Sequence, residues 1–352
     1  MSDFIRVYVG TYTGGSSEGI YTYRLDMVSG ALTYESHIPG VENPSFLALS
    51  SKNDYLYAVN ENGEGAVTAF AIDQATGTLT RLNQRPSRGG LPCSIYVDAT
   101  SQCVLVANYG SGTVTVFPIQ EDGSIGEDTT FIQHEGSSVD PARQKEPHAH
   151  MIITDPANNY AFVPDLGMDR VMIYRLDPEQ GKLTPNDPSY AQVRAGSGPR
   201  HLTFHPTVKY AYVINEMGNT VTVFTYDADQ GAMNEIQMVN TLPIDFDGVS
   251  HTADVHITPD GKFLYGSNRG HDSLAMFSVD QGTGLLTPIG IEPTRGANPR
   301  NFSIDPTGTF LLAANQSTDN VTTFRINHDT GALTEVSIAE VPTAVCLKFV
   351  EI

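Results

Sequence analysis

The chain has 352 residues, of which 40% are apolar and 17% are charged, a composition typical of a globular protein rather than a disordered or fibrous one. Its 20 basic and 40 acidic residues give a net charge of −20, which argues against binding to nucleic acid or docking on an anionic membrane. Three cysteines without a Cys-x-x-Cys pair, and an N-terminus without the pattern of a signal peptide, lead us to expect a cytoplasmic protein.

One short pattern recurs along the whole chain: glycine, any residue, an aliphatic residue and then usually threonine. Its seven copies are separated by 46 to 58 residues, with a mean near 50. Self-similarity at such a period indicates a repeat architecture. The copies begin at Gly30, Gly77, Gly123, Gly181, Gly231, Gly284 and Gly331.

The elements around each glycine alternate apolar and polar residues, the period expected of β-strands. The first copy contains the segments 6–13, 19–26 and 32–37. Later copies add an inner strand that we expect to open at a proline, followed by an apolar strand that closes on Asn or Asp. The openings are Pro44, Pro92, Pro147, Pro199, Pro299 and Pro342, and the closings are Asn60, Asn108, Asp165, Asn215, Asn268 and Asn315.

Four short strands in about 50 residues, without helical periodicity, predict an all-β fold: a seven-bladed β-propeller with four antiparallel strands per blade. We expect a single domain over 1–352. The first copy has only three strands, and the chain ends on a lone strand at 342–352. The simplest closure makes this C-terminal strand the innermost strand of the first blade, which leaves fewer sheet edges unpaired.

The longest spacing, between Gly123 and Gly181, predicts an insertion near 126–146. This segment directly precedes the EPHAH sequence at 146–150. It either covers the mouth of the propeller or forms an ordinary surface loop.

The topology predicts where the polar residues gather. In an antiparallel pair, the start of the first strand and the end of the second lie at the same edge. The openings and closings of all blades therefore lie on one face, near the central channel, where propellers bind small molecules. The openings carry His148, His150, Arg200, His201 and Arg300, the fifth repeat carries His251 and Asp254, and the closings carry Asp165, Glu216 and Arg269, with Arg170 slightly beyond.

Arg200, Arg269 and Arg300 concentrate positive charge in a chain with only 20 basic residues, and guanidinium groups bind carboxylate or phosphate bidentately. We therefore expect a small anionic ligand. An alternative is that these arginines form structural ion pairs with Asp165, Glu216 and Asp254.

Two other functions are open. His148 and His150 would share one face of a strand and could bind a metal, although no third ligand follows at motif spacing, so we expect no metal and no cofactor. A propeller that binds a protein partner would need exposed apolar loops, whereas these openings carry His, Arg and acidic residues.

Six segments carry a further signal: GPRHLTFHP (198–206), YAYVINE (210–216), ADVHITPDGKFLYGSNR (253–269), PRNFSIDPTGTFLLAANQ (299–316), PHAH (147–150) and VPDLGMDR (163–170). Through them the chain resembles, over essentially its whole length, the seven-bladed propeller lactonases. This family includes bacterial 6-phosphogluconolactonases and fungal 3-carboxy-cis,cis-muconate lactonizing enzymes.

The resemblance implies that His148, Arg200, Glu216 and Arg269 carry the chemistry. For hydrolysis of a lactone, His148 or Glu216 would activate a water molecule, while Arg200 and Arg269 would stabilise the oxyanion. The other residues of the mouth would contact the substrate, which we expect to be 6-phosphogluconolactone. The alternatives are an unphosphorylated lactone and the cyclization of a carboxymuconate-like acid. The substrate-contacting residues would be His150, His201, Arg300, Asp165, Arg170, His251 and Asp254.

Overall fold

The computed structural model describes residues 3–351, which form seven four-stranded antiparallel sheets. The predicted fold class, a seven-bladed β-propeller with four strands per blade, is confirmed. The only helix among the described residues is the three-residue 3₁₀ turn η1 (Gln316–Thr318), and no helix there is long and apolar enough to cross a membrane.

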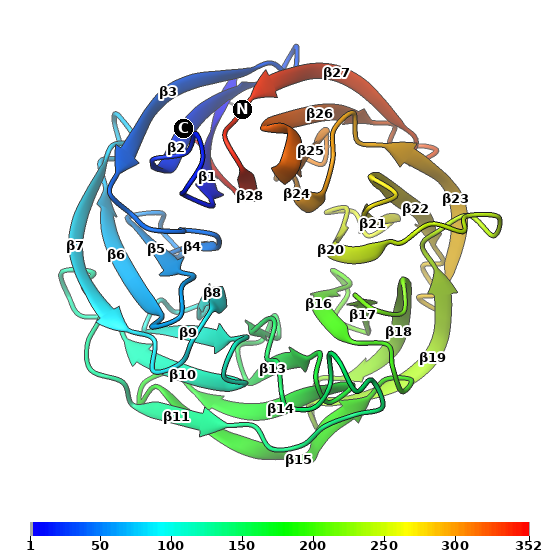
Figure 1. The fold of residues 1–352 in the computed structure, drawn as a ribbon, viewed down its shortest axis with the longest axis horizontal. Helices are drawn as coiled ribbons and strands as arrows, with labels where there is room; N and C mark the ends of the chain where they lie inside the picture. The colour runs from blue at the N-terminus through cyan, green and yellow to red at the C-terminus, as the bar shows by residue number, and fades with distance from the viewer. Residues whose placement is uncertain (1–2, 352) are drawn as a thin grey trace. The chain divides into compact units, whose positions relative to one another are not determined.

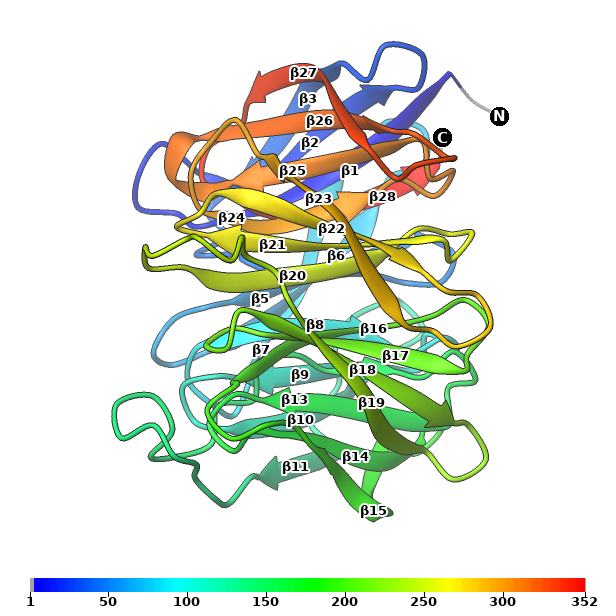
Figure 2. The ribbon, with the colours of Figure 1, turned by 90° about the vertical axis from the view of Figure 1, so that its right-hand side faces the viewer.

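The chain divides into two compact units, and the predicted single domain stays a prediction. The first unit consists of the chain up to Pro39, His201–Tyr226 and the chain from Asn234 onward. Four sheets belong wholly or mainly to it. They are β28-β1-β2-β3, with β1 (Phe4–Thr11), β2 (Gly19–Asp26), β3 (Leu32–Pro39) and β28 (Ala344–Glu351); β16 (Pro199–Phe204), β17 (Tyr210–Asn215), β18 (Thr220–Asp227) and β19 (Ala232–Asn240); β20 (His251–Ile257), β21 (Phe263–Arg269), β22 (Ser273–Val279) and β23 (Leu286–Pro293); and β24 (Pro299–Ile304), β25 (Phe310–Asn315), β26 (Asn320–Ile326) and β27 (Leu333–Glu340). Figure 2 shows the last two sheets following one another.

The second unit consists of Gly40–Arg200 and Asp227–Met233 and holds three sheets. They are β4 (Leu47–Leu49), β5 (Tyr55–Asn60), β6 (Ala66–Ile72) and β7 (Leu79–Pro86); β8 (Pro92–Val97), β9 (Cys103–Asn108), β10 (Thr113–Pro118) and β11 (Thr130–Gln133); and β12 (Ile153–Thr154), β13 (Tyr160–Asp165), β14 (Arg170–Asp177) and β15 (Lys182–Gln192).

The repeated glycine has a structural cause. All seven copies have φ between 58° and 82°, in the left-handed region that glycine adopts without a steric penalty. At Gly284 a Cβ atom would also lie 2.3 Å from the ring of Tyr210 on the neighbouring sheet. The repeat thus marks the turn before each outer strand, at a place where a side chain would be excluded.

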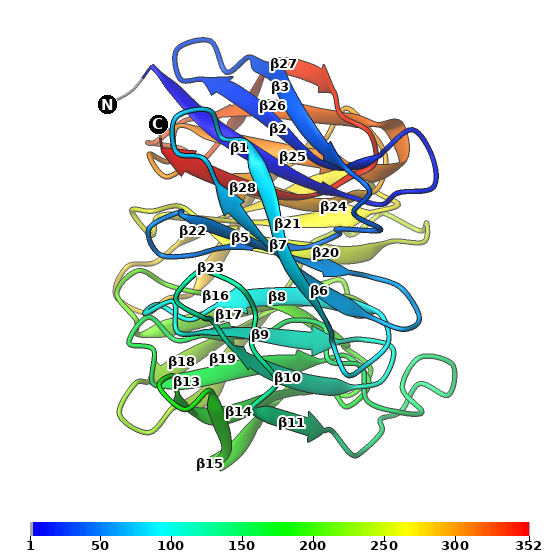
Figure 3. The ribbon, with the colours of Figure 1, turned by 90° about the vertical axis from the view of Figure 1, so that its left-hand side faces the viewer.

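Some predicted strand boundaries are wrong. The inner strands begin at Leu47, Ile153 and Ala344 instead of Pro44, Pro147 and Pro342, because only part of each segment pairs with its neighbour. Residues 130–133 form the outer strand β11, so the insertion begins after it and covers residues 134–152 (Figure 3).

The C-terminal strand closes the first blade as predicted; Ile352 lies outside the described residues. β28 pairs with β1 from Arg6↔Val350 to Gly10↔Cys346, and Figure 1 shows the two strands side by side. Leu347 of β28 is buried in a core with residues from two sheets, Val7 of β1 and Phe310 and Leu312 of β25. The closing strand therefore contributes apolar packing as well as backbone hydrogen bonds.

Replacing Leu347 with alanine should lower the free energy of unfolding by about 2–5 kcal/mol, because it leaves a cavity in this core. Ile338→Ala, at a side chain that is 51% exposed on β27, is the matched control and should change stability by less than about 0.5 kcal/mol. Urea denaturation of both variants measures the difference. Equal losses would show that β28 does not contribute a packed core.

Candidate active site

The predicted meeting of openings and closings is confirmed within the sheets. Pro92 pairs with Asn108, Pro299 with Asn315, and His251 with Arg269. Each pair places the start of an inner strand and the end of its neighbour at one edge.

Three of the six predicted closing residues join neighbouring sheets. The side-chain amides of Asn108, Asn268 and Asn315 are buried and donate to backbone carbonyls at 3.0–3.2 Å. Those carbonyls follow the outer strand of the preceding sheet. Asp165 is the only aspartate among the predicted closing residues, and the other five are asparagines.

His148 of the second unit is held in one orientation. Its Nδ1 lies 2.9 Å from the carbonyl oxygen of Tyr109, and its ring stacks on the Tyr109 ring at 4.6 Å. Because a carbonyl only accepts, Nδ1 carries the hydrogen, and in the neutral ring the lone pair lies on Nε2. The backbone N–H of His148 donates to Asp165 Oδ1 at 2.8 Å.

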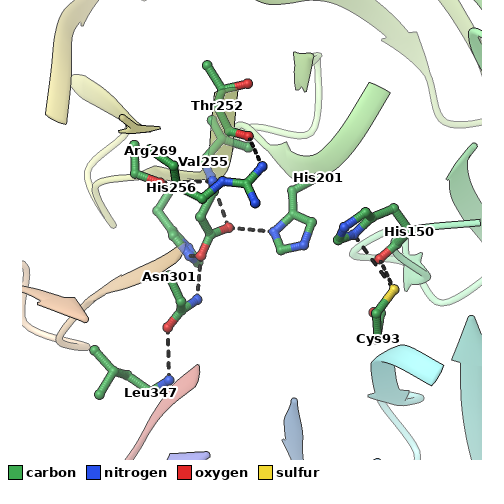
Figure 4. A network of polar contacts seen from close by, with 12 residues as sticks. Cys93, His150, His201, Thr252, Val255, His256, Arg269, Asn301 and Leu347 are labelled. Carbon is green, nitrogen blue, oxygen red and sulfur yellow. Dashed lines mark hydrogen bonds and ion pairs between the residues drawn. The ribbon is translucent and has the colours of Figure 1, made fainter. Parts of the chain in front are cut away.

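His150 lies one residue beyond Ala149, which forms an isolated bridge with Asp165. It is buried, its ring meets Tyr109 edge-on, and the Cys93 thiol donates to its carbonyl oxygen at 3.2 Å (Figure 4). The two histidines flank a bridged residue instead of lying in a regular strand. No group of three or more His, Cys, Asp or Glu within residues 3–351 is arranged to hold a metal ion.

The insertion is attached beside His148. Gln144 is fully buried and donates to the Leu166 carbonyl, Ser138 donates to Asp169, and Arg143 donates to the Tyr109 hydroxyl at 3.2 Å. The insertion is therefore packed on the turn after β13 and places a cation on the tyrosine beneath His148. Sequence reasoning missed Tyr109 and Arg143, since neither lies at a strand opening.

Two predicted substrate-binding residues of this unit face protein. Asp165 is fully buried, and both of its carboxylate oxygens accept hydrogen bonds, from His134 on one side and from the backbone of His148 and Gly167 on the other. The Arg170 guanidinium lies 4.2 Å above the ring of Tyr190 on the outer strand β15. The structure thus does not bring Arg170 to the inner strands. Arg200, the second residue of β16, is 2% exposed.

In the first unit, Glu216 and Arg269 form an ion pair of 2.8 Å, with both side chains mostly buried. Arg269 also donates to the carbonyls of His251 and Thr252 at the start of β20. Arg269 thus makes one of the ion pairs that the structural alternative expects, the one with Glu216, and is also bonded to its neighbouring strand.

Asp254 is the centre of a second network in this unit. Figure 4 labels its partners His201, His256 and Asn301. Its carboxylate accepts from His201 Nδ1 at 2.7 Å, from His256 Nε2 at 3.1 Å and from the Asn301 amide, whose oxygen accepts the Leu347 N–H of β28. Burial alone raises the pKa of a carboxyl, but His256, His201 and their hydrogen bonds outweigh burial and hold the pKa of Asp254 well below its usual range. Asp254 thus orients His201. No sequence pattern pointed to His256 or Asn301, apart from their positions near Asp254 and Arg300.

The remaining predicted residues lie near the strand openings. His251 is half-buried at the start of β20, and the Arg300 guanidinium lies 5.5 Å from the ring centre of Tyr12.

Known proteins match this chain along its length. The family model described as lactonase, 7-bladed beta-propeller, matches residues 6–349. A 6-phosphogluconolactonase of Bacillus subtilis is 42% identical over 84% of this chain and 83% of its own, and one of Formosa agariphila is 36% identical over 85% and 86%. The solved structure of a periplasmic gluconolactonase of Pseudomonas aeruginosa is 33% identical and superposes with a TM-score of 0.94 over 99% of both chains.

A second solved structure, from Bacteroides fragilis, is 39% identical with a TM-score of 0.94 over 99% of both chains. The chain belongs to the lactonase family of seven-bladed β-propellers. The predicted class of enzyme, a hydrolase of cyclic esters, is confirmed.

The Asp254 network predicts a pH-dependent contribution to stability. A carboxyl whose pKa is lowered by folding stabilises the protein above its unfolded pKa, and this stabilisation disappears as the pH falls through the folded value. Asp254→Asn should therefore lower the free energy of unfolding by about 3–5 kcal/mol at neutral pH. The difference in this free energy between wild type and variant, the stability gap, should narrow below about pH 4.

Urea denaturation from pH 7 to 3 measures this gap. Asp280→Asn is the control: the Thr283 hydroxyl and backbone lower the pKa of Asp280 too, but this carboxyl lies in an exposed turn. Its substitution should have a small effect at every pH. A gap for Asp254→Asn that stays constant with pH would contradict the prediction.

Proposed function

We propose that this lactonase hydrolyses 6-phosphogluconolactone, with His148 as the general base that activates water. The observation that carries the base assignment is the hydrogen bond from His148 Nδ1 to the Tyr109 carbonyl. It fixes the tautomer in which Nε2 holds the lone pair that a general base needs. The sequence left His148 and Glu216 as alternatives. Glu216 is paired with Arg269, which favours His148.

In this proposal Arg269 and Arg200 stabilise the negative charge that develops on the lactone carbonyl oxygen. Glu216 orients the Arg269 guanidinium, as the backbone carbonyls of His251 and Thr252 also do. Water attacks the carbonyl carbon, and His148 takes one proton from it. As the ring C–O bond breaks, His148 returns this proton to the ring oxygen, which becomes a hydroxyl, and the new carboxylic acid releases its proton to solvent to give the carboxylate.

The phosphorylated substrate is supported by the names of the Bacillus and Formosa relatives. The roles predicted for His150, His201, His251 and Arg300 as substrate contacts are part of this proposal. A second candidate substrate is gluconolactone, because the Pseudomonas relative is named a gluconolactonase. The cytoplasmic location stays a prediction; the three cysteines are free and buried.

The direct assay is hydrolysis of freshly generated 6-phosphogluconolactone by the purified protein, with the spontaneous rate subtracted and gluconolactone run in parallel. We expect a kcat/KM for the phosphorylated lactone that exceeds the value for gluconolactone. The reverse preference would favour gluconolactone, and no turnover of either would leave the carboxymuconate-type cyclization to be tested next.

His148→Asn should lower kcat by a factor of about 100 to 10,000, because the asparagine amide can still donate to Tyr109 but offers no basic nitrogen. The fold should be retained, with an unchanged circular dichroism spectrum. His328→Asn, at an exposed turn position, is the control and should leave kcat unchanged. Wild-type turnover by His148→Asn would reject His148 as the base.

A further inference from the structure

The sheet β12–β15 differs from the others at the residue that closes its second strand. In three other sheets this residue is an asparagine, and its amide donates to the carbonyl of the residue that follows the outer strand of the preceding sheet. The pairs are Asn108 with Ser87, Asn268 with Thr241, and Asn315 with Thr294. In the sheet β12–β15 the corresponding residue is Asp165.

The side chain of an ionised aspartate has no N–H group to donate. The donor comes instead from the residue that follows the outer strand of the preceding sheet. That residue is His134, which follows β11. Its backbone N–H donates to Gly112 O, just as the Ser87 N–H donates to Gly65 O, so the two occupy the same place in the repeat. His134 Nδ1 lies 2.6 Å from Asp165 Oδ2, and both side chains are buried. The hydrogen bond between the sheets is therefore kept with its direction reversed.

The other side of the His134 ring is also occupied. The Tyr174 hydroxyl lies 2.9 Å from His134 Nε2. Burial, and then the negative charge of Asp165, raise the pKa of Tyr174, so the hydroxyl keeps its proton. Because a carboxylate only accepts, Nδ1 of His134 carries the hydrogen of the bond to Asp165.

The reversal gives the second carboxylate oxygen a function that the asparagines do not have. Asp165 Oδ1 accepts from the backbone N–H groups of His148 at 2.8 Å and of Gly167 at 3.0 Å. Ionised acceptors form stronger hydrogen bonds than amide oxygens. An asparagine here would present its NH₂ group either to His134 or to these two N–H groups, so one side would meet donor against donor.

We propose that His134 and Asp165 are positioning residues, which fix the backbone of His148 and so aim its Nε2 at the substrate. Neither touches the substrate, because both are buried and all their polar atoms bind protein. The inference rests on the proposed role of His148 as the base. It replaces the predicted substrate contact of Asp165.

The test is the double variant His134→Ser and Asp165→Asn. It gives this sheet the same pair of residues as its neighbour, where Ser87 and Asn108 form the bond. We expect a thermal midpoint close to that of wild type, a KM within a factor of two, and a kcat lowered by about 10- to 100-fold, because the base is misplaced and the fold is not. Asn315→Ala, which breaks the equivalent hydrogen bond of another sheet, should lower the thermal midpoint and leave kcat within a factor of two.

If the double variant does not fold, His134→Asn and His134→Leu decide the question. Both lose the Tyr174 hydrogen bond, but only asparagine can donate to Asp165, so kcat should be preserved in His134→Asn and lowered in His134→Leu. Equal kcat values, or wild-type kcat in the double variant, would overturn the proposal.

His148→Asn, assayed alongside, separates this inference from the proposed function. Loss of turnover in His148→Asn, together with wild-type kcat in the double variant, would reject the positioning role alone. Wild-type turnover in His148→Asn would reject the base and the positioning role together.

Discussion

In four sheets a hydrogen bond joins the end of the second strand to the preceding sheet, and the local structure of the site depends on this constraint. Where an asparagine makes it, a buried amide satisfies a buried carbonyl, and each such bond adds about 1 kcal/mol while its loss leaves a polar group unpaired. It holds the edge at which inner strands open and their neighbours close. Tyr109 directly follows Asn108, so its backbone is placed by a buried hydrogen bond one residue away.

The buried charged side chains of the site have partners close by, in a chain whose net charge is −20. Arg269 is paired with Glu216, and the Asp254 carboxylate accepts hydrogen bonds from two histidines and an amide. Each group is held in one geometry by several partners, which is what pre-organised sites require because little then has to reorder when charge develops on the substrate. The Asp254 network also reaches β28 through Asn301, so the strand that closes the first blade supports a site residue.

Membership of the lactonase family fits these observations and leaves the substrate to experiment. His148 and His201 are both oriented through Nδ1, one by a carbonyl and the other by a carboxylate. In both rings the hydrogen on Nδ1 is engaged with protein, and this bond sets the direction of Nε2.

The sequence by itself determined the repeat, the number of blades and the closing strand, because the glycine that needs a positive φ and the alternation of strand residues are local features. It also identified the openings and closings that meet at one edge, because that follows from antiparallel pairing. Only the tertiary structure decided which of these residues face protein. Asp165 and Arg170 were predicted to contact the substrate. In the structure Asp165 binds His134, and Arg170 lies over the ring of Tyr190. Tyr109, His134 and Arg143 lie outside the quoted motifs, and Asn301 lies inside one without being singled out. The partners of these four residues are 31 to 47 residues away in the sequence, and no local pattern records such contacts.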